Sequence, residues 1–192
     1  MVRRKVIFAP GEYYHIYNRG VEHRPIFLKE ENYIFLLRRV KQRCAQFKIA
    51  IIAYVLMPNH YHFLVRQEGG KTVSQFVQAV FNSYTKAFNQ MYRRSGRLFE
   101  SPFRAVHVSC EDYLLHLCRY LHRNPLEAGL VNDPAAWPYS NYLEWIGQRD
   151  GTLVDRTFVQ AYFPTPAEYK RFVLEYEPSN SMREAVQHLA LE

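Results

Sequence analysis

The sequence has few cysteines and no long apolar run, and each shortage excludes a class of protein. Its three cysteines, Cys44, Cys110 and Cys118, form no Cys-x-x-Cys pair, so neither a zinc finger nor a disulfide framework is expected. No apolar run reaches the roughly 20 residues that a membrane-spanning helix needs, and the first residues lack the apolar core of a secretory signal. We therefore expect a protein of the reducing cytoplasm with no membrane partner.

Aromatic residues and positive charge are both plentiful. The 192 residues include 15 Tyr and 13 Phe, and the formal net charge is +7. Positive charge favours a polyanionic partner, and aromatic rings are the surfaces on which bases of single-stranded nucleic acid stack. Neither property is specific, because aromatic residues also fill cores and many basic proteins bind no nucleic acid.

The order of hydrophobic patterns predicts an α+β fold. The predicted strands cover 12–18, 49–57, 60–66 and 103–108. The predicted helices cover 29–47, 72–92 and 111–123. The resulting order, βαββαβα, is that of a ferredoxin-like antiparallel sheet backed by helices.

The last of these helices is expected to end or kink at Asn124, because Pro125 restricts the residue before it. Several prolines interrupt the chain that follows. Shorter helical pieces are expected there, around 139–147, 157–162 and 166–176. We therefore divide the chain into a domain of residues 1–147 and a helical C-terminal extension of residues 148–192, with Trp137 and Trp145 in the core.

The segment from Met57 to Val65, MPNHYHFLV, contains the sharpest chemical pattern. Residues two apart on a strand point to the same face, so His60 and His62 would present two imidazoles side by side. Tyr61 would point the other way, into packing. Two neutral imidazoles at this spacing can chelate one divalent metal. The alternative is an accidental pair on a solvated sheet face, since the chain has eight histidines.

The helix predicted over residues 111–123 has two distinct sides. The apolar side consists of Leu114, Leu117, Cys118 and Leu121. The opposite side gathers a phenol, an imidazole, a guanidinium and an amide among its members Tyr113, His116, Tyr120, Arg123 and Asn124. An ordinary solvated face with a half-buried tyrosine explains the same spacing. Spacing alone does not distinguish Tyr120 from the other tyrosines.

Basic residues cluster around the loop after the second predicted helix. The candidate DNA contacts are Lys86, Arg93, Arg94, Arg97 and Arg104, to which we add Arg123 from the helix described above. The aromatic residues interleaved with the loop are Tyr92, Phe99 and Phe103. Such a mixture suits a single strand, because phosphates take the charge and bases stack. In the alternative interpretation the loop is solvated and its aromatic residues anchor it to the core. Arg3, Arg4 and Lys5 would form a further basic arm or a disordered end of the chain.

Four segments stand in a distinctive order and separation. They are MPNHYHFLV (57–65), GRLFESPFR (96–104), YLHRNPLEAGLV (120–131) and WPYSNY (137–142). Together they resemble the HUH single-tyrosine transposases of insertion sequences, and most closely their REP-associated tyrosine transposase relatives. The resemblance runs from about Tyr13 to Gly147.

This resemblance implies a metal-dependent endonuclease and strand transferase of DNA transposition or recombination. His60 and His62 would ligate Mg²⁺ or Mn²⁺, and Asn124 would complete the site where insertion-sequence members usually have Gln. Tyr120 would be the nucleophile, forming a 5′-phosphotyrosine link with single-stranded or hairpin DNA. His116 is a candidate proton acceptor. The assembly would be a homodimer, as in insertion-sequence members, or a monomer.

Two other functions are compatible with the same residues. One is a non-catalytic single-stranded nucleic-acid-binding module of the same fold. The other is a metal-dependent hydrolase of small phosphate esters in which Tyr120 is merely structural.

Overall fold

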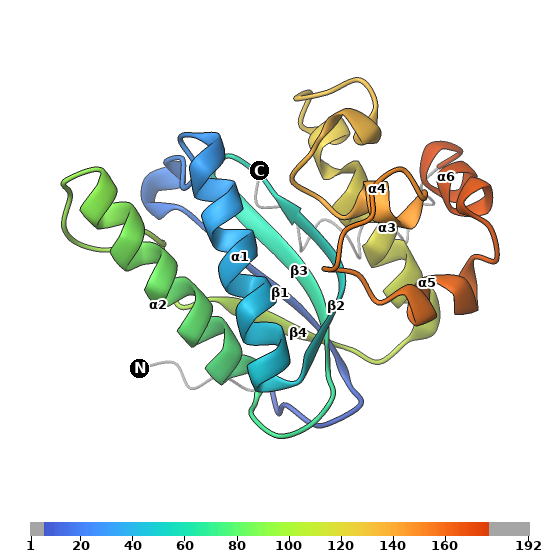
Figure 1. The fold of residues 1–192 in the computed structure, drawn as a ribbon, viewed down its shortest axis with the longest axis horizontal. Coiled ribbons are helices and arrows are strands. Elements are labelled where there is room, and N and C mark those ends of the chain that lie inside the picture. The colour runs from blue at the N-terminus through green and yellow to red at the C-terminus, as the bar shows by residue number, and fades with distance from the viewer. Residues whose placement is uncertain (1–5, 177–192) are drawn as a thin grey trace.

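A four-stranded antiparallel sheet forms the centre of the molecule in the computed structural model, which describes residues 6–176 (Figure 1). Its strands are β1 (Tyr13–Arg19), β2 (Ile49–Leu56), β3 (His60–Gln67) and β4 (Arg104–Val108). They lie in the order β2-β3-β1-β4, and every neighbouring pair is antiparallel. The predicted ferredoxin-like sheet is confirmed. The basic arm expected at Arg3, Arg4 and Lys5 lies outside the described residues.

Helices cover both faces of this sheet (Figure 1). The helices on one face are α1 (Glu30–Phe47) and α2 (Val73–Met91). Those on the other face are α3 (Glu111–Glu127), α4 (Tyr142–Trp145), α5 (Arg156–Tyr162) and α6 (Pro166–Leu174). Two short 3-10 helices, η1 (Val21–His23) and η2 (Pro134–Ala136), lie in the connections. None of the helices in residues 6–176 is long and apolar enough to span a membrane.

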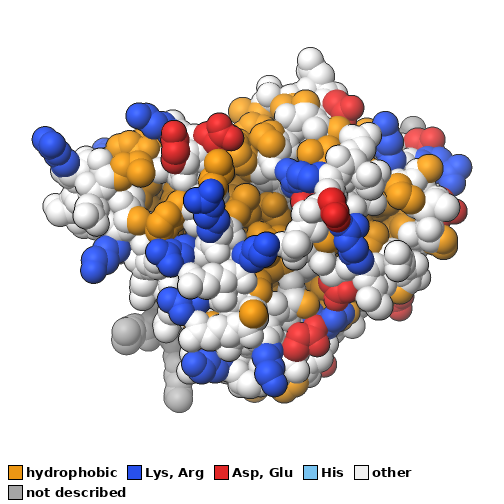
Figure 2. Space-filling model, in the orientation of Figure 1, with side chains coloured by type: hydrophobic (Ala, Val, Ile, Leu, Met, Phe, Trp, Pro, Cys, Tyr) orange, Lys and Arg blue, Asp and Glu red, His pale blue; other side chains and the backbone are white. Residues whose placement is uncertain are grey.

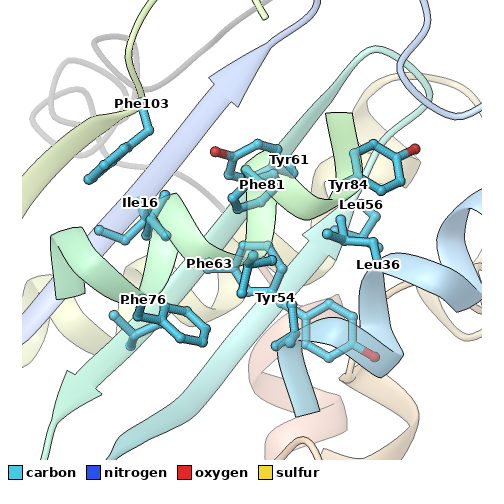
Figure 3. Close-up of a cluster of buried hydrophobic side chains, with 14 of the residues drawn as sticks. Ile16, Leu36, Tyr54, Leu56, Tyr61, Phe63, Phe76, Phe81, Tyr84 and Phe103 are labelled. Atoms are coloured by element: carbon cyan, nitrogen blue, oxygen red, sulfur yellow. The ribbon is translucent and has the colours of Figure 1, made fainter. Parts of the chain in front are cut away.

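The period-two alternation of the central strands creates two separate cores. Ile16, Tyr61 and Phe63 point toward α1 and α2 (Figure 3). The Tyr61 ring stacks on Phe81 of α2 at a centroid distance of 4.0 Å, so its predicted direction is confirmed. The alternate residues, including Tyr17 and Leu64, face α3. Each fully buried apolar side chain stabilises the fold by about 1.5–3 kcal/mol, so this alternation strongly favours one register.

The helix carrying Tyr120 extends one turn further than its sequence indicates. The expected end at Asn124 is wrong, because α3 continues through Pro125 to Glu127. Pro125 lacks an N–H, but a proline near a helix end removes few of the helix's bonds. The Ala128 N–H donates to the Asn124 carbonyl at 2.9 Å, and the Leu130 N–H donates to the Pro125 carbonyl at 2.9 Å. These bonds close the turn, and Asn124 is therefore presented from regular helix.

The segment after residue 147 packs into the same core as α3 and α4. Phe158, Tyr169 and Val173 are buried in one cluster with Tyr142 and Trp145. The core position expected for Trp145 is confirmed. Trp137 is half-buried, and its indole N–H donates to the Leu56 carbonyl at 3.1 Å. The helical pieces expected around 139–147 and 166–176 are found in shorter form, and the one expected at 157–162 begins one residue earlier. The division of the chain after residue 147 stays a prediction.

Candidate active site

Strand β3 and helix α3 bring the predicted metal ligands and the predicted nucleophile together within one chain. The His60 and His62 rings meet edge to face, with centroids 5.1 Å apart. Nε2 of His60 lies 3.3 Å from Oδ1 of Asn124. The ring of Tyr120 stands edge-on to that of His62 at a centroid distance of 5.9 Å. Four residues chosen from the sequence therefore share one place in the structure.

The local sequence explains how these side chains come to face one another. Pro58 and Asn59 make the tight connection between β2 and β3, so His60 is the first residue of its strand. The apolar side of α3 packs on the sheet as predicted, with Leu114, Leu117, Cys118 and Leu121 all buried. Asn124 is one helical turn beyond Tyr120 and is only 2% exposed. The polar side of α3 is thus partly turned toward the sheet instead of toward solvent.

Both histidines of the pair are buried, which removes the alternative of a solvated sheet face. His60 is 3% exposed and His62 is 0% exposed. Burial lowers the pKa of His60 to about 4, since a charged imidazole is poorly solvated there. Burial, together with the neighbouring His15 and His60, holds the pKa of His62 well below its ordinary range. Both imidazoles are therefore neutral at pH 7, the form that binds metals.

The hydrogen-bonding of the pair fits a divalent cation. Nδ1 of His60 lies 2.7 Å from Oδ1 of Asn59, a shorter contact than the 3.3 Å from Nε2 to Oδ1 of Asn124, so Nδ1 is the donor and Nε2 keeps its lone pair. Nε2 of His62 is buried and has no hydrogen-bond partner among the described residues. Leaving such an atom unsatisfied costs about 1–3 kcal/mol unless a ligand occupies the position.

The remaining donors limit what kind of metal site this can be. Among residues 6–176 no group of three or more His, Cys, Asp or Glu side chains is placed to hold a metal. Two imidazoles and the Asn124 amide oxygen would be the protein's ligands. A set with few protein ligands leaves coordination positions for phosphate oxygens or water.

Three residues of β1 border the site, and sequence reasoning missed all of them. Tyr17 is the strand partner of His62, and Arg19 is the strand partner of His60. His15 contacts His62 directly, and its Nε2 lies 2.9 Å from Nδ1 of His62. Arg19 forms an ion pair with Glu100 and contributes to lowering the pKa of His60. Alternation along β1 places these residues on one face, but sequence does not reveal the register that sets them opposite the histidines.

The predicted DNA contacts are spread around the molecule. Arg104 of β4 is exposed and is the strand partner of Tyr17, so it lies on the same sheet face as His62. The loop carrying Arg93, Arg94 and Arg97 returns to the end of β1, where Phe99 bridges to Gly20. Lys86 lies on α2, across the sheet from the site. Figure 2 shows Lys and Arg side chains scattered over that far face.

The aromatic residues of the basic loop serve the core. Phe103 is 8% exposed, and the Phe99 ring meets those of Tyr61 and Phe81 edge to face. Tyr92 packs against Phe88 and donates to Oδ1 of Asn32 at 2.9 Å. These rings therefore anchor the loop to the core, and DNA contact by its basic residues stays a prediction.

Two further residues of α3 are occupied by structural contacts. Arg123 donates to the Val173 carbonyl at 2.9 Å and forms an ion pair with Glu127. His116 contacts Arg119, which donates to its Nδ1. A neutral His116 in this contact carries its hydrogen on Nε2, which opposes a role as proton acceptor.

Comparisons with known proteins agree with this geometry. A family model described as "Transposase IS200 like" matches residues 10–124, which include His60, His62 and Tyr120. None of the curated proteins matches the chain.

Solved structures are similar to it as well, among them the following two. The structure of a REP-associated tyrosine transposase bound to a REP hairpin has a TM-score of 0.67 at 18% identity, over 81% of this chain and 94% of that one. This likeness shows the fold. A crystal structure of a provisionally assigned transposase from Deinococcus radiodurans R1 has a TM-score of 0.43 at 16% identity, over 64% of this chain and 96% of that one. The second likeness is too low to carry an argument.

Proposed function

The chain belongs to the IS200-like transposase family, and we propose that it nicks and rejoins single-stranded DNA through a covalent bond to Tyr120. Family membership makes it a DNA-processing protein of transposition. The observation that carries the finer proposal is the meeting of Tyr120 with His62, whose rings have centroids 5.9 Å apart. Nε2 of that histidine has no hydrogen-bond partner within residues 6–176.

The metal-binding residues of the proposed site are His60, His62 and Asn124. The two imidazoles would contribute Nε2 atoms and Asn124 its amide oxygen. Mg²⁺ or Mn²⁺, when bound, would neutralise phosphate charge and act as a Lewis acid on a phosphoryl oxygen. The neutral state of both histidines follows from their burial and needs no further partner.

Tyr120 supplies the nucleophile in this proposal. Its phenolic oxygen forms a bond to the scissile phosphorus as the bond from phosphorus to the 3′ oxygen breaks. The phenolic proton is released and the 3′ oxygen gains a proton, so no water is consumed. The 5′-phosphotyrosine link keeps the energy of the broken bond, and a 3′ hydroxyl can later reverse the step.

Hairpin DNA is the substrate class we infer. The similar structure of a REP-associated tyrosine transposase is bound to a REP hairpin. In this chain, Arg104 is an exposed cation on the sheet face of the site, and Arg93 and Arg97 are exposed in the loop at the end of β1. Cations in these positions suit a strand that passes over the His60 end of the sheet.

The test is covalent capture of DNA. The full chain is incubated with Mn²⁺ and a labelled hairpin whose single-stranded flanks are randomised, and denaturing gels detect a protein–DNA adduct. We expect an adduct that Tyr120→Phe abolishes and that EDTA prevents. Tyr113→Phe, on the same helix, is the matched control and should form the adduct normally.

Two results would contradict the proposal in different ways. Cleavage by Tyr120→Phe without an adduct would identify a hydrolase in which Tyr120 is structural. Binding of hairpins by the wild type, with no cleavage under any condition that loads Mn²⁺, would identify a binding module.

A further inference from the structure

A third buried histidine lies against the candidate site. His15 is in β1, and its Nε2 is 2.9 Å from Nδ1 of His62. The two rings are nearly parallel, with centroids 5.1 Å apart and an interplanar angle of 9°. Both side chains are 0% exposed, so water does not compete for the hydrogen bond. His15 contacts neither Asn124 nor His60 in any hydrogen bond of the described residues.

A hydrogen bond between two neutral imidazoles allows two arrangements. When His62 donates from Nδ1, its Nε2 keeps a lone pair. When His15 donates, Nε2 of His62 carries the hydrogen and cannot bind a cation. Nε2 of His62 and Nδ1 of His15 are both without a hydrogen-bond partner in residues 6–176, so internal hydrogen bonds favour neither arrangement. A cation at Nε2 of His62 would select the arrangement in which Nδ1 of His62 donates to His15.

A neighbouring side chain also determines which ring nitrogen of His60 carries the hydrogen. Oδ1 of Asn59 lies 2.7 Å from Nδ1 of His60, and an amide oxygen can only accept. The amide's Nδ2 donates to the His23 carbonyl at 3.4 Å, which supports this orientation. The shorter contact places the single N–H of neutral His60 on Nδ1, so its Nε2 keeps a lone pair that faces Oδ1 of Asn124 at 3.3 Å. A cation between these two acceptors would satisfy both. Two different side chains thus act on Nδ1 of the two candidate ligands.

We propose that His15 is a positioning residue that accepts a hydrogen bond from His62 and so keeps Nε2 of His62 available to a divalent cation. This inference rests on the proposed function and adds a residue that would touch neither cation nor DNA. Tyr17 assists by stacking on His15 and His62, at centroid distances of 4.8 and 5.7 Å, which restricts rotation of the His62 ring. Loss of such an outer hydrogen bond weakens metal binding by about 10- to 100-fold.

Metal affinity of the full chain tests the role of His15. Mn²⁺ binding is followed by the electron paramagnetic resonance signal of free Mn²⁺. We expect His15→Leu to weaken binding by about 10- to 100-fold. His15→Gln, whose amide oxygen can accept from His62, should retain most of the affinity. His107→Leu, at an exposed histidine of β4 that pairs with Glu12, is the matched control and should bind as the wild type does.

A second measurement needs no variant. Nitrogen–proton correlation spectra of the imidazoles in the wild type loaded with diamagnetic Zn²⁺ identify which ring nitrogen carries hydrogen. We expect hydrogen on Nδ1 of both His62 and His15. Hydrogen on Nε2 of His62 would overturn the inference even if His15→Leu failed to fold.

The outcomes separate this inference from the proposed function. A wild type that binds neither Mn²⁺ nor Zn²⁺ would overturn the metal-assisted function itself. Normal Mn²⁺ binding by folded His15→Leu would overturn the role of His15 and leave the function intact.

Discussion

Buried histidines are the distinctive residues of this protein, and His122 shows how burial changes the pKa of such a side chain. It lies on α3, away from the candidate ligands, and is 0% exposed. Its Nδ1 contacts the Tyr169 hydroxyl, and its Nε2 lies 2.9 Å from Oδ1 of Asn141. Both ring nitrogens are therefore satisfied when the ring is neutral. Burial lowers the pKa of His122 to about 4.

The low pKa of His122 makes stability depend on pH. In the unfolded chain His122 has the ordinary pKa of 6.5, so between pH 6.5 and 4 it binds a proton there but stays neutral in the folded chain. The full contribution of this residue is thus present above pH 6.5 and is lost as the pH falls toward 4. We expect a loss of about 3 kcal/mol in the free energy of unfolding from His122 alone. Urea unfolding of the wild type and of His122→Gln, between pH 7.5 and 4.5, measures it.

Comparison of the two proteins isolates this residue from the other buried histidines. The variant should be less stable at pH 7 and should lose less stability on acidification. Parallel pH profiles of the two proteins would show that His122 does not carry the effect.

At the scale of elements, one asparagine joins β2 to α3. The register of β2 shifts between Ile51 and Ala53, which leaves backbone groups to be satisfied by other means. Oδ1 of Asn141 accepts from the Tyr54 N–H at 2.8 Å, and its Nδ2 donates to the Ile52 carbonyl at 2.9 Å. The same Oδ1 accepts a hydrogen bond from Nε2 of His122 at 2.9 Å. The irregular strand and the tyrosine-bearing helix are therefore held by one amide.

Removing this amide should destabilise the whole fold. Asn141→Ala leaves the Tyr54 N–H and the His122 ring without their acceptor, whereas the Ile52 carbonyl keeps the Trp145 indole N–H at 3.2 Å. We expect the free energy of unfolding to fall by about 2 to 4 kcal/mol. Asn132→Ala, at an exposed position, is the control and should change stability little. Equal denaturation midpoints for the two variants would refute the linking role of Asn141.

These elements also show which features the sequence could predict. Alternation in β3 was enough to place His60 and His62 on one face and Tyr61 on the other, because strand periodicity is local. Asn141 is 87 residues from Tyr54 in the sequence. Its role depends on the register shift in β2, which no local sequence pattern predicts. His15 was missed for the same reason, since it meets His62 only through strand register. Tyr120 was chosen by resemblance, and its catalytic role stays a prediction.

At the scale of the whole molecule, the candidate site is contained in one chain. His60, His62, Asn124 and Tyr120 meet without a second copy. We therefore predict that a monomer forms the DNA adduct. The initial rate per chain should not change with protein concentration, which gel-based adduct assays across a wide dilution series can measure.

Mixing of inactive variants gives a sharper form of this test. His62→Ala lacks a ligand and Tyr120→Phe lacks the nucleophile, so their mixture should form no adduct. A mixture of wild type with Tyr120→Phe is the control and should retain the activity of its wild-type portion. Adduct formation by the two inactive variants together would mean that chains share sites.

The fastening of α3 has a consequence for the order of events in strand exchange. The helix is bound through His122 to Asn141, and through Arg119 and Arg123 to the Phe172 and Val173 carbonyls of α6. In the proposed reaction, a 5′ end bound to Tyr120 would therefore be attached to a helix that several side-chain hydrogen bonds hold to the rest of the fold. The free 3′ end would then be the part that moves to meet its joining partner. The length of DNA that carries this 3′ end would limit the distance between the two sequences that can be exchanged.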